Sequence, residues 1–160
     1  MCPVAYEHPG SEGHAGYLTD SMPLFERGTS ILNQNVLSSV HYLSNTDGCG
    51  KGFEIIDMRF YLEHFTSMPT DMRVDVFFDG TSFGSVDCIP LSDGVAAPYM
   101  RCDLLGVHIF VTDDEDVKLS MWAFNLPEVT EGTTFGFDLR WKDLGTGVDN
   151  MYLGVTTNRW

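Results

Sequence analysis

Positive charge is scarce in this sequence. Nine lysine and arginine residues stand against 23 aspartate and glutamate residues, which gives a formal net charge of −14. A surface with this charge repels the phosphates of nucleic acids and the headgroups of anionic lipids. We therefore expect neither nucleic acid nor a membrane among the direct partners of the chain.

Long hydrophobic runs are also absent. No stretch approaches the ~20 apolar residues that a membrane-spanning helix needs. Residues 1–10 have neither the basic start nor the hydrophobic centre of a signal peptide. These features predict a chain that is made and kept in a cytoplasm. At 160 residues it is long enough to close a core as a single domain.

The four cysteines lack the spacing of a metal or redox site. No Cys-x-x-Cys pair occurs, so a zinc ribbon or a thioredoxin-type site has no support. Because a chain of this length does not need disulfide bonds and shows no signal peptide, reduced thiols are the favoured prediction. The alternative is a secreted protein with two disulfide bonds, in which Cys88 and Cys102 are the more expected pair.

Convincing helical periodicity is missing, and apolar residues alternate with polar ones instead. The alternation is clearest in residues 117–142, where we predict one β-hairpin that reverses within residues 127–132. Its inward positions are Val117, Leu119, Met121 and Ala123, then Phe135, Phe137, Leu139 and Trp141. Trp122 and Phe124 lie on the outward face of the first run. We expect a second sheet, an arm or a partner to contact these two side chains.

Alternating residues predict further strands over residues 29–43, 53–64, 72–78 and 107–111, a return strand with Val86 and Cys88, and a closing strand with Met151, Leu153 and Val155. In residues 29–43 the alternating set is Leu32, Val36, Val40 and Tyr42, and asparagine and serine residues favour a strand over a helix there. In residues 53–64 the expected buried set is Ile56, Met58, Phe60 and Leu62. Turn signals separate these segments, including Asp79-Gly80 and residues 143–147. The pattern predicts an all-β domain over residues 29–160, an antiparallel β-sandwich or jelly roll.

Residues 1–28 show no periodicity and are rich in glycine, proline, serine, glutamate and histidine. We expect them to form an extended N-terminal arm that is held by a neighbouring subunit. Its scattered apolar residues are the candidate interface anchors: Val4, Tyr6, Tyr17, Leu18 and Phe25.

Residues with metal-binding or catalytic potential are few. Asp113, Asp114 and Asp116 are weak calcium candidates, because carboxylates on a turn suit this ion, but a solvated turn is the simpler interpretation. No nucleophile motif such as Gly-x-Ser-x-Gly and no phosphate-binding loop before a helix occurs. We therefore expect no enzyme, no metal and no cofactor.

Exposed aromatic residues are a further feature of the predicted sandwich. Phe77, Phe110, Trp122 and Phe124 all lie opposite the core side of their strands. Sandwich lectins stack sugars on exposed rings, and a second buried layer explains the same pattern.

Residues 131–154 carry a resemblance to a known class. Glu131-Gly-Thr-Thr-Phe-Gly-Phe-Asp-Leu-Arg-Trp-Lys-Asp-Leu-Gly-Thr-Gly147 and Val148-Asp-Asn-Met-Tyr-Leu-Gly154 resemble a pattern in tailed-phage virion proteins, in which a Gly-x-Thr-Phe strand leads through an Asp-x-x-Gly turn to a hydrophobic strand. The resemblance implies a capsid decoration, cement or tail-associated β-domain. Such a protein would contact copies of itself and other virion proteins, and would be assembled in the host cytoplasm.

A second resemblance involves a different class. Pro98-Tyr-Met-Arg-Cys-Asp-Leu-Leu105 is similar to the ML lipid-recognition family around its cysteine, with Asp47-Gly-Cys49 as the early cysteine. The family implies a secreted immunoglobulin-like sandwich, but no late cysteine near Val155 is present to pair with Cys49. We predict a non-enzymatic structural protein, and a viral particle component is the preferred prediction. The alternative is a secreted β-sandwich that binds lipid or carbohydrate.

Overall fold

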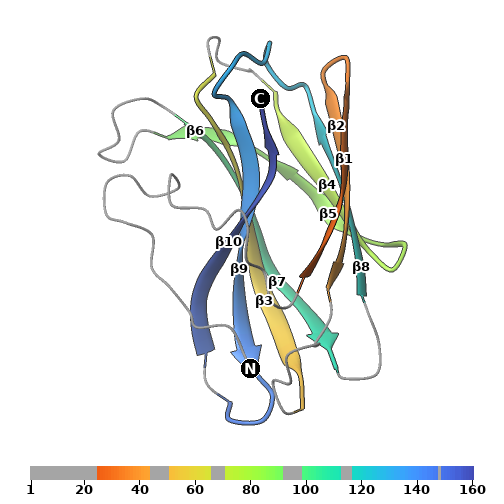
Figure 1. Ribbon diagram of the computed structural model, residues 1–160. Coiled ribbons are helices and arrows are strands. Elements are labelled where there is room, and N and C mark those ends of the chain that lie inside the picture. The colour runs from red at the N-terminus through yellow and green to blue at the C-terminus, as the bar shows by residue number, and fades with distance from the viewer. Residues whose placement is uncertain (1–24, 44–50, 66–70, 92–98, 113–116, 148) are drawn as a thin grey trace.

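The computed structural model describes residues 25–43, 51–65, 71–91, 99–112, 117–147 and 149–160, and their regular secondary structure is entirely β-strand (Figure 1). The strands are β1 (Phe25–Asn33), β2 (Val36–Leu43), β3 (Phe53–Glu63), β4 (Arg73–Phe78), β5 (Thr81–Asp87), β6 (Ile89–Leu91), β7 (Tyr99–Val111), β8 (Val117–Phe124), β9 (Thr134–Asp143) and β10 (Asp149–Arg159).

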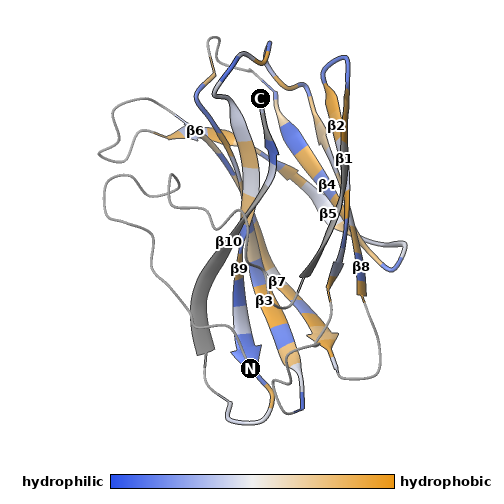
Figure 2. Ribbon diagram, viewed as in Figure 1, coloured by the Kyte–Doolittle hydropathy of each residue, from blue (hydrophilic) through white to orange (hydrophobic). Residues whose placement is uncertain are grey.

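The strands form two antiparallel sheets that pack face to face. The first, which we call sheet A, has the order β1-β2-β8-β4-β5, and the second, sheet B, has the order β10-β9-β3-β7-β6. Apolar and polar residues alternate along β3 and β4 (Figure 2), so each sheet turns one face inward. The fold is therefore the predicted all-β antiparallel β-sandwich.

The core lies between the sheets and is rich in aromatic rings. The Phe60 ring lies 6.4 Å from that of Phe135 and 6.0 Å from that of Phe137, and the Phe53 ring is edge-on to Trp141. All four inward positions predicted for β8 and all four for β9 are buried. The buried faces of these two strands are thus confirmed.

The prediction that β8 and β9 form one hairpin is wrong. β8 pairs with β2 and β4 in sheet A, whereas β9 pairs with β3 and β10 in sheet B. The chain leaves β8 through Asn125, at a positive φ of 59°, and the Leu126 amide donates to the Asn35 carbonyl of the β1–β2 turn. The proline and glycine signals of this segment therefore mark a crossing between sheets.

Residues 29–43 are two strands rather than one. β1 and β2 pair as a hairpin that turns at Gln34, which has a φ of 54°. The inward side chains of β2 are Leu37, Ser39, His41 and Leu43, so Val40 and Tyr42 point outward, contrary to the predicted face. Ser39 and His41 are tolerated in the core because they hydrogen-bond to each other at 2.6 Å.

A bulge in sheet B explains why Ile55, and not Ile56, is in the core. The register of β3 shifts between Ile55 and Asp57 against both neighbouring strands. The Asp57 carboxylate accepts hydrogen bonds from the Gly106 amide at 2.8 Å and from Arg140 at 3.1 Å. Positive φ values at Gly106 and His108 interrupt the alternation of β7. Because of this interruption, the sequence pattern identified only residues 107–111 of a strand that begins at Tyr99.

Two predicted turns are confirmed. Asp79 and Gly80 join β4 to β5 with φ values of 50° and 81°, as a tight hairpin turn requires. Asp143 ends β9, and its side chain accepts hydrogen bonds from the amides of Gly145 and Thr146. The segment that resembles virion proteins is therefore a strand, a turn and a strand.

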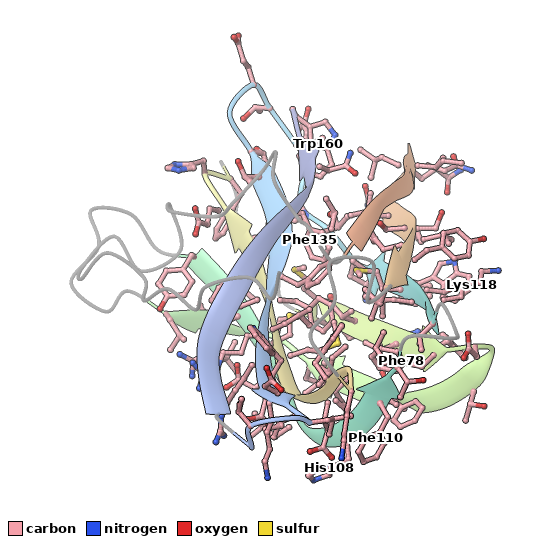
Figure 3. The ribbon with its side chains drawn as sticks, turned by 60° about the horizontal axis from the view of Figure 1, so that its bottom comes forward. Phe78, His108, Phe110, Lys118, Phe135 and Trp160 are labelled. Atoms are coloured by element: carbon pink, nitrogen blue, oxygen red, sulfur yellow. A yellow bond between two sulfur atoms is a disulfide. The ribbon has the colours of Figure 1, made fainter. Side chains whose placement is uncertain are left out.

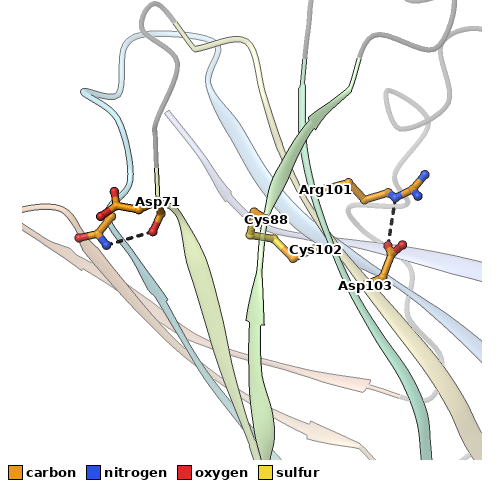
Figure 4. Close-up of a disulfide and its surroundings, with 6 residues drawn as sticks. Asp71, Cys88, Arg101, Cys102 and Asp103 are labelled. Carbon is orange, nitrogen blue, oxygen red and sulfur yellow. Dashed lines mark hydrogen bonds and ion pairs between the residues drawn. A yellow bond between two sulfur atoms is a disulfide. The ribbon is translucent and has the colours of Figure 1, made fainter.

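Cys88 and Cys102 form a disulfide bond (Figure 4). The prediction of reduced thiols is therefore wrong for these two cysteines. They are the pair that the disulfide alternative named as the more expected one. The bond ties the segment where the chain passes from β5 of sheet A to β6 of sheet B onto β7. Cys2 and Cys49 lie outside the described residues.

The N-terminal arm lies almost wholly outside the described residues, and so do its anchors Val4, Tyr6, Tyr17 and Leu18. β1 begins at Phe25, so residues 25–28, which we assigned to the arm, belong to a strand.

Replacing Phe137 by aspartate should abolish folding. The change removes a buried ring between Phe60 and His41 and places a charge in the core, at a cost of roughly 3–5 kcal/mol or more. Urea unfolding followed by circular dichroism measures the loss. Lys142→Asp, at a partly exposed position of the same strand, should cost under about 1 kcal/mol. Equal stability of the two variants would contradict the assigned faces of β9.

Removing the disulfide bond should lower the melting temperature without changing the fold. In the chain-entropy account, opening a loop of 14 residues costs about 3 kcal/mol. Intact-mass spectrometry with and without a reductant should detect the bond, and calorimetry of Cys88→Ser with Cys102→Ser should report the destabilisation. An unchanged melting temperature in this double variant would be the contrary result.

Candidate functional site

The outer face of sheet A presents aromatic side chains on three neighbouring strands. We call Tyr42, Phe77, Trp122 and Phe124 the aromatic face. They occupy outward positions of β2, β4 and β8, whose inward positions fill the core. Trp122 is 37% exposed and Tyr42 is 40% exposed. Exposed aromatic side chains that lie together on an outer sheet face are available for binding.

Ring contacts fix the orientation of the aromatic face. The Phe77 and Trp122 rings meet edge to face, with centroids 5.1 Å apart and an angle of 89° between the planes. The Arg73 guanidinium lies 4.3 Å from the centroid of the Phe124 ring, as a cation–π contact. Because these contacts hold the rings, the surface is ordered before a ligand arrives, which reduces the entropy cost of binding.

Polar groups border the indole of Trp122 on both sides. Ser38 of β2 and Asp75 of β4 lie directly opposite Trp122 in the sheet register, and Ser85 of β5 lies opposite Asp75. The Ser85 hydroxyl donates to the Asp75 carboxylate at 2.6 Å, and Arg73 is 3.5 Å from the same carboxylate. The face thus combines a flat apolar ring with hydrogen-bonding groups in one row.

Charge on this face is balanced. The outward positions of β2, β4, β5 and β8 carry two basic side chains, Arg73 and Lys118, and two acidic ones, Asp75 and Asp87. The whole chain has a net charge of −14. Along these four strands, the outward basic and acidic side chains are therefore equal in number, although the protein as a whole is strongly acidic.

Trp122 and Phe124, the predicted second-face contacts, both lie on this face. The described part of the chain places no third layer over them (Figure 1). Phe110, which is 56% exposed, belongs to sheet B, where it lies near His108 (Figure 3). It is therefore not part of the aromatic face.

The calcium candidates Asp113, Asp114 and Asp116 lie outside the described residues. Within the described ranges, no group of three histidine, cysteine, aspartate or glutamate residues is placed to hold a metal ion. The same ranges contain no helix that is long and apolar enough to cross a membrane.

The outer face of sheet B holds a second group of polar residues that sequence analysis missed. We call it the polar cluster: Arg59, Tyr61 and Glu63 of β3, Arg101 and Asp103 of β7, and Asp138 of β9. In the register, Arg59 lies between Asp103 and Asp138, and Tyr61 lies opposite Arg101. The three central strands of sheet B therefore bring opposite charges side by side.

Several members of the polar cluster are buried. Asp138 is 0% exposed and Glu63 is 8% exposed. Asp103 forms ion pairs with Arg101 at 3.0 Å (Figure 4) and with Arg59 at 3.7 Å. Buried charges are costly unless they are compensated, so the balance of charge in this cluster is a condition for its burial.

Burial and neighbouring charge shift the pKa values of the cluster. Burial, and then the charge of Asp138, raises the pKa of Glu63 from the ordinary 4.5 to about 7. Burial also raises the pKa of Tyr61, with the Asp138 charge adding to the effect. Burial acts to lower the pKa of Arg101, but the charge and hydrogen bond of Asp103, together with Tyr61 and Tyr99, produce a net rise.

The sequence contained one signal for the polar cluster. Charged residues of opposite sign recur at alternate positions of the three strands, as in Arg59 and Glu63 or Arg101 and Asp103. Alternation alone predicted that such positions face water, and it could not show that Asp138 is buried.

Comparisons with known proteins gave distant structural similarities. No protein family and no curated protein matches the chain. Among solved structures, the chain is similar to AvmM, which catalyses macrocyclization in alchivemycin A biosynthesis, with 9% identity and a TM-score of 0.46 over 96% of this chain and 91% of that chain.

The structure is also similar to two collagen-binding domains, with lower TM-scores. The subdomain ACE19 of the Enterococcus faecalis surface protein ACE has 8% identity and a TM-score of 0.36, over 85% of this chain and 97% of that chain. The domain of a Staphylococcus aureus adhesin has 7% identity and a TM-score of 0.34, over 86% and 99% of the two chains. Similarities at this level assign neither an activity nor a ligand to this chain.

Proposed function

We propose that the chain is a non-enzymatic structural protein that works through protein–protein contacts, and that the aromatic face joins it to a second copy of itself. The observation that supports this proposal is the exposed Trp122 ring on the central strand of sheet A. Tryptophan, tyrosine and arginine are the residues that most often dominate the energy of protein interfaces.

Electrostatics favours this face for contact between copies. Two chains with a charge of −14 each repel one another over most of their surfaces. On the aromatic face, Arg73 and Lys118 of one copy can meet Asp75 and Asp87 of the other, because a two-fold interface presents the same patch on both sides. Burial of the aromatic rings then supplies the favourable free energy.

The finer proposal is that the protein is a component of a viral particle, such as a capsid decoration, cement or tail-associated protein. It rests on the resemblance of residues 131–154. These residues belong to the hairpin of β9 and β10 at one edge of sheet B, away from the aromatic face. In this proposal the aromatic face joins copies, and the edge of sheet B contacts other virion proteins.

A second candidate function is carbohydrate binding by a secreted β-sandwich. The Cys88–Cys102 disulfide bond favours it, because such bonds persist in oxidising compartments. The row of Ser38, Trp122, Asp75 and Ser85 favours it too, since sugars stack on flat rings and hydrogen-bond through their hydroxyl groups.

Replacing Trp122 by serine should weaken dimerisation. Loss of a central aromatic contact costs about 2 kcal/mol or more, which raises the dissociation constant about 30-fold or more. Sedimentation velocity over a range of protein concentrations measures the change. The matched control is Phe110→Ser, which removes an exposed ring from sheet B and should leave dimerisation unchanged. A wild-type protein that stays monomeric at high concentration would contradict the proposal.

A sugar titration separates the two candidate functions. Neutral oligosaccharides should produce no saturable change in tryptophan fluorescence if the aromatic face serves only protein contact. Saturable binding that is lost in Trp122→Ser and weakened in Asp75→Asn would establish the carbohydrate function instead. Phe110→Ser again serves as the control.

A further inference from the structure

The charges of the polar cluster balance without Glu63. Arg59 and Arg101 contribute two positive charges, and Asp103 and Asp138 contribute two negative charges. A neutral Glu63 leaves the described members of the cluster with no net charge, whereas an ionised Glu63 adds one negative charge that the Asp138 charge disfavours. Such a charge is costly in a buried position.

In the described part of the chain, one carboxyl oxygen of Glu63 has no partner that would stabilise a negative charge, and the other has only a long contact. Its Oε1 atom is buried and has no hydrogen-bond partner among the described residues. Its Oε2 atom lies 3.9 Å from His64 Nε2, which is beyond hydrogen-bond distance, and His64 is largely exposed. The carboxyl group is therefore held where its neutral form fits better than its charged form.

The polar and charged groups that share the outer face of sheet B with Glu63 come from three strands, in addition to its chain neighbour His64. β3 contributes Arg59 and Tyr61, β7 contributes Tyr99, Arg101 and Asp103, and β9 contributes Thr134 and Asp138. On the next strand, Arg159 of β10 takes the register position opposite Thr134. Of these groups, Asp138 is the one whose charge acts on the Glu63 carboxyl together with burial.

We propose that Glu63 is a proton switch in the outer face of sheet B. With the proton bound, the polar cluster is neutral and closed. When the proton leaves, the repulsion between Glu63 and Asp138 loosens the packing of β3 against β9 and opens this face to water. The switch acts on sheet B and is independent of the aromatic face on sheet A.

The direction of the pH effect follows from the pKa of Glu63. This pKa is about 7 in the folded protein and 4.5 for an ordinary glutamate. Between these pH values the folded state holds more protons than the unfolded state, so stability decreases as the pH rises from 4.5 to 7 and this contribution is constant above 7. The unfolding equilibrium constant should rise on the order of 10²-fold across this window.

The test compares Glu63→Gln with Glu128→Gln in the full chain. Glutamine mimics the protonated carboxyl group, so Glu63→Gln should lose most of the pH dependence of urea unfolding between pH 5 and 8. Glu128 is exposed in the connection between β8 and β9, and its replacement makes the same chemical substitution outside the polar cluster. This control variant should keep the wild-type pH dependence.

A local measurement decides whether the face opens. Hydrogen exchange of the paired amides of β3 and β9 around Tyr61 and Gly136, corrected for intrinsic rates, should accelerate above pH 7 in the wild type and not in Glu63→Gln. Full pH dependence in Glu63→Gln, or unchanged exchange in the wild type, would overturn the proposal. If Glu63→Gln does not fold, a carbon NMR titration of the wild type decides. A Glu63 midpoint near 7 supports the switch, and a midpoint near 4.5 rules it out.

Discussion

The register of β9 against β3 determines both faces of sheet B. On the inner face it sets Phe137 beside Phe60, and on the outer face it sets Asp138 beside Arg59. A slip of one residue would move the aromatic rings to the outside and the charges into the core. The same pairing therefore specifies the aromatic core and the charge balance of the polar cluster. The Asp57 carboxylate supports this register, because it binds Arg140 of β9 and the bulged backbone of β7 at the same time.

The connections that cross between the two sheets determine which strands lie at the centre of each sheet. Before the chain passes to sheet B after Phe124, β8 pairs with β2 on one side and β4 on the other, and this central position places Trp122 in the middle of an outer face. Another crossing, from β5 to β6, is tied to β7 by the Cys88–Cys102 bond. Crossings depend on contacts between distant residues, such as that of Leu126 with Asn35.

Local patterns in the sequence predicted the strands of this protein better than their partners. Alternation identified the buried faces of β4, β8 and β9, and Asp79-Gly80 identified a hairpin, because each depends on neighbouring residues. The inward face of β2 was predicted wrongly, because the polar residues Ser39 and His41 lie in the core and hydrogen-bond to each other there. The prediction that Ile56 is in the core was wrong because a bulge shifts the register of β3 at this residue. The exposed position of Trp122 was readable from the alternation of β8, whereas the burial of Glu63 and Asp138 depends on the meeting of three strands.

The two outer faces differ in their chemistry. On the aromatic face, rings supply the apolar surface and Arg73 pairs with Asp75. On the outer face of sheet B, a single proton decides whether the buried charges balance. Because the two faces belong to different sheets, loosening of β3 and β9 leaves the strands that present Trp122 paired. The fold thus places the aromatic face and the proposed proton switch on different sheets.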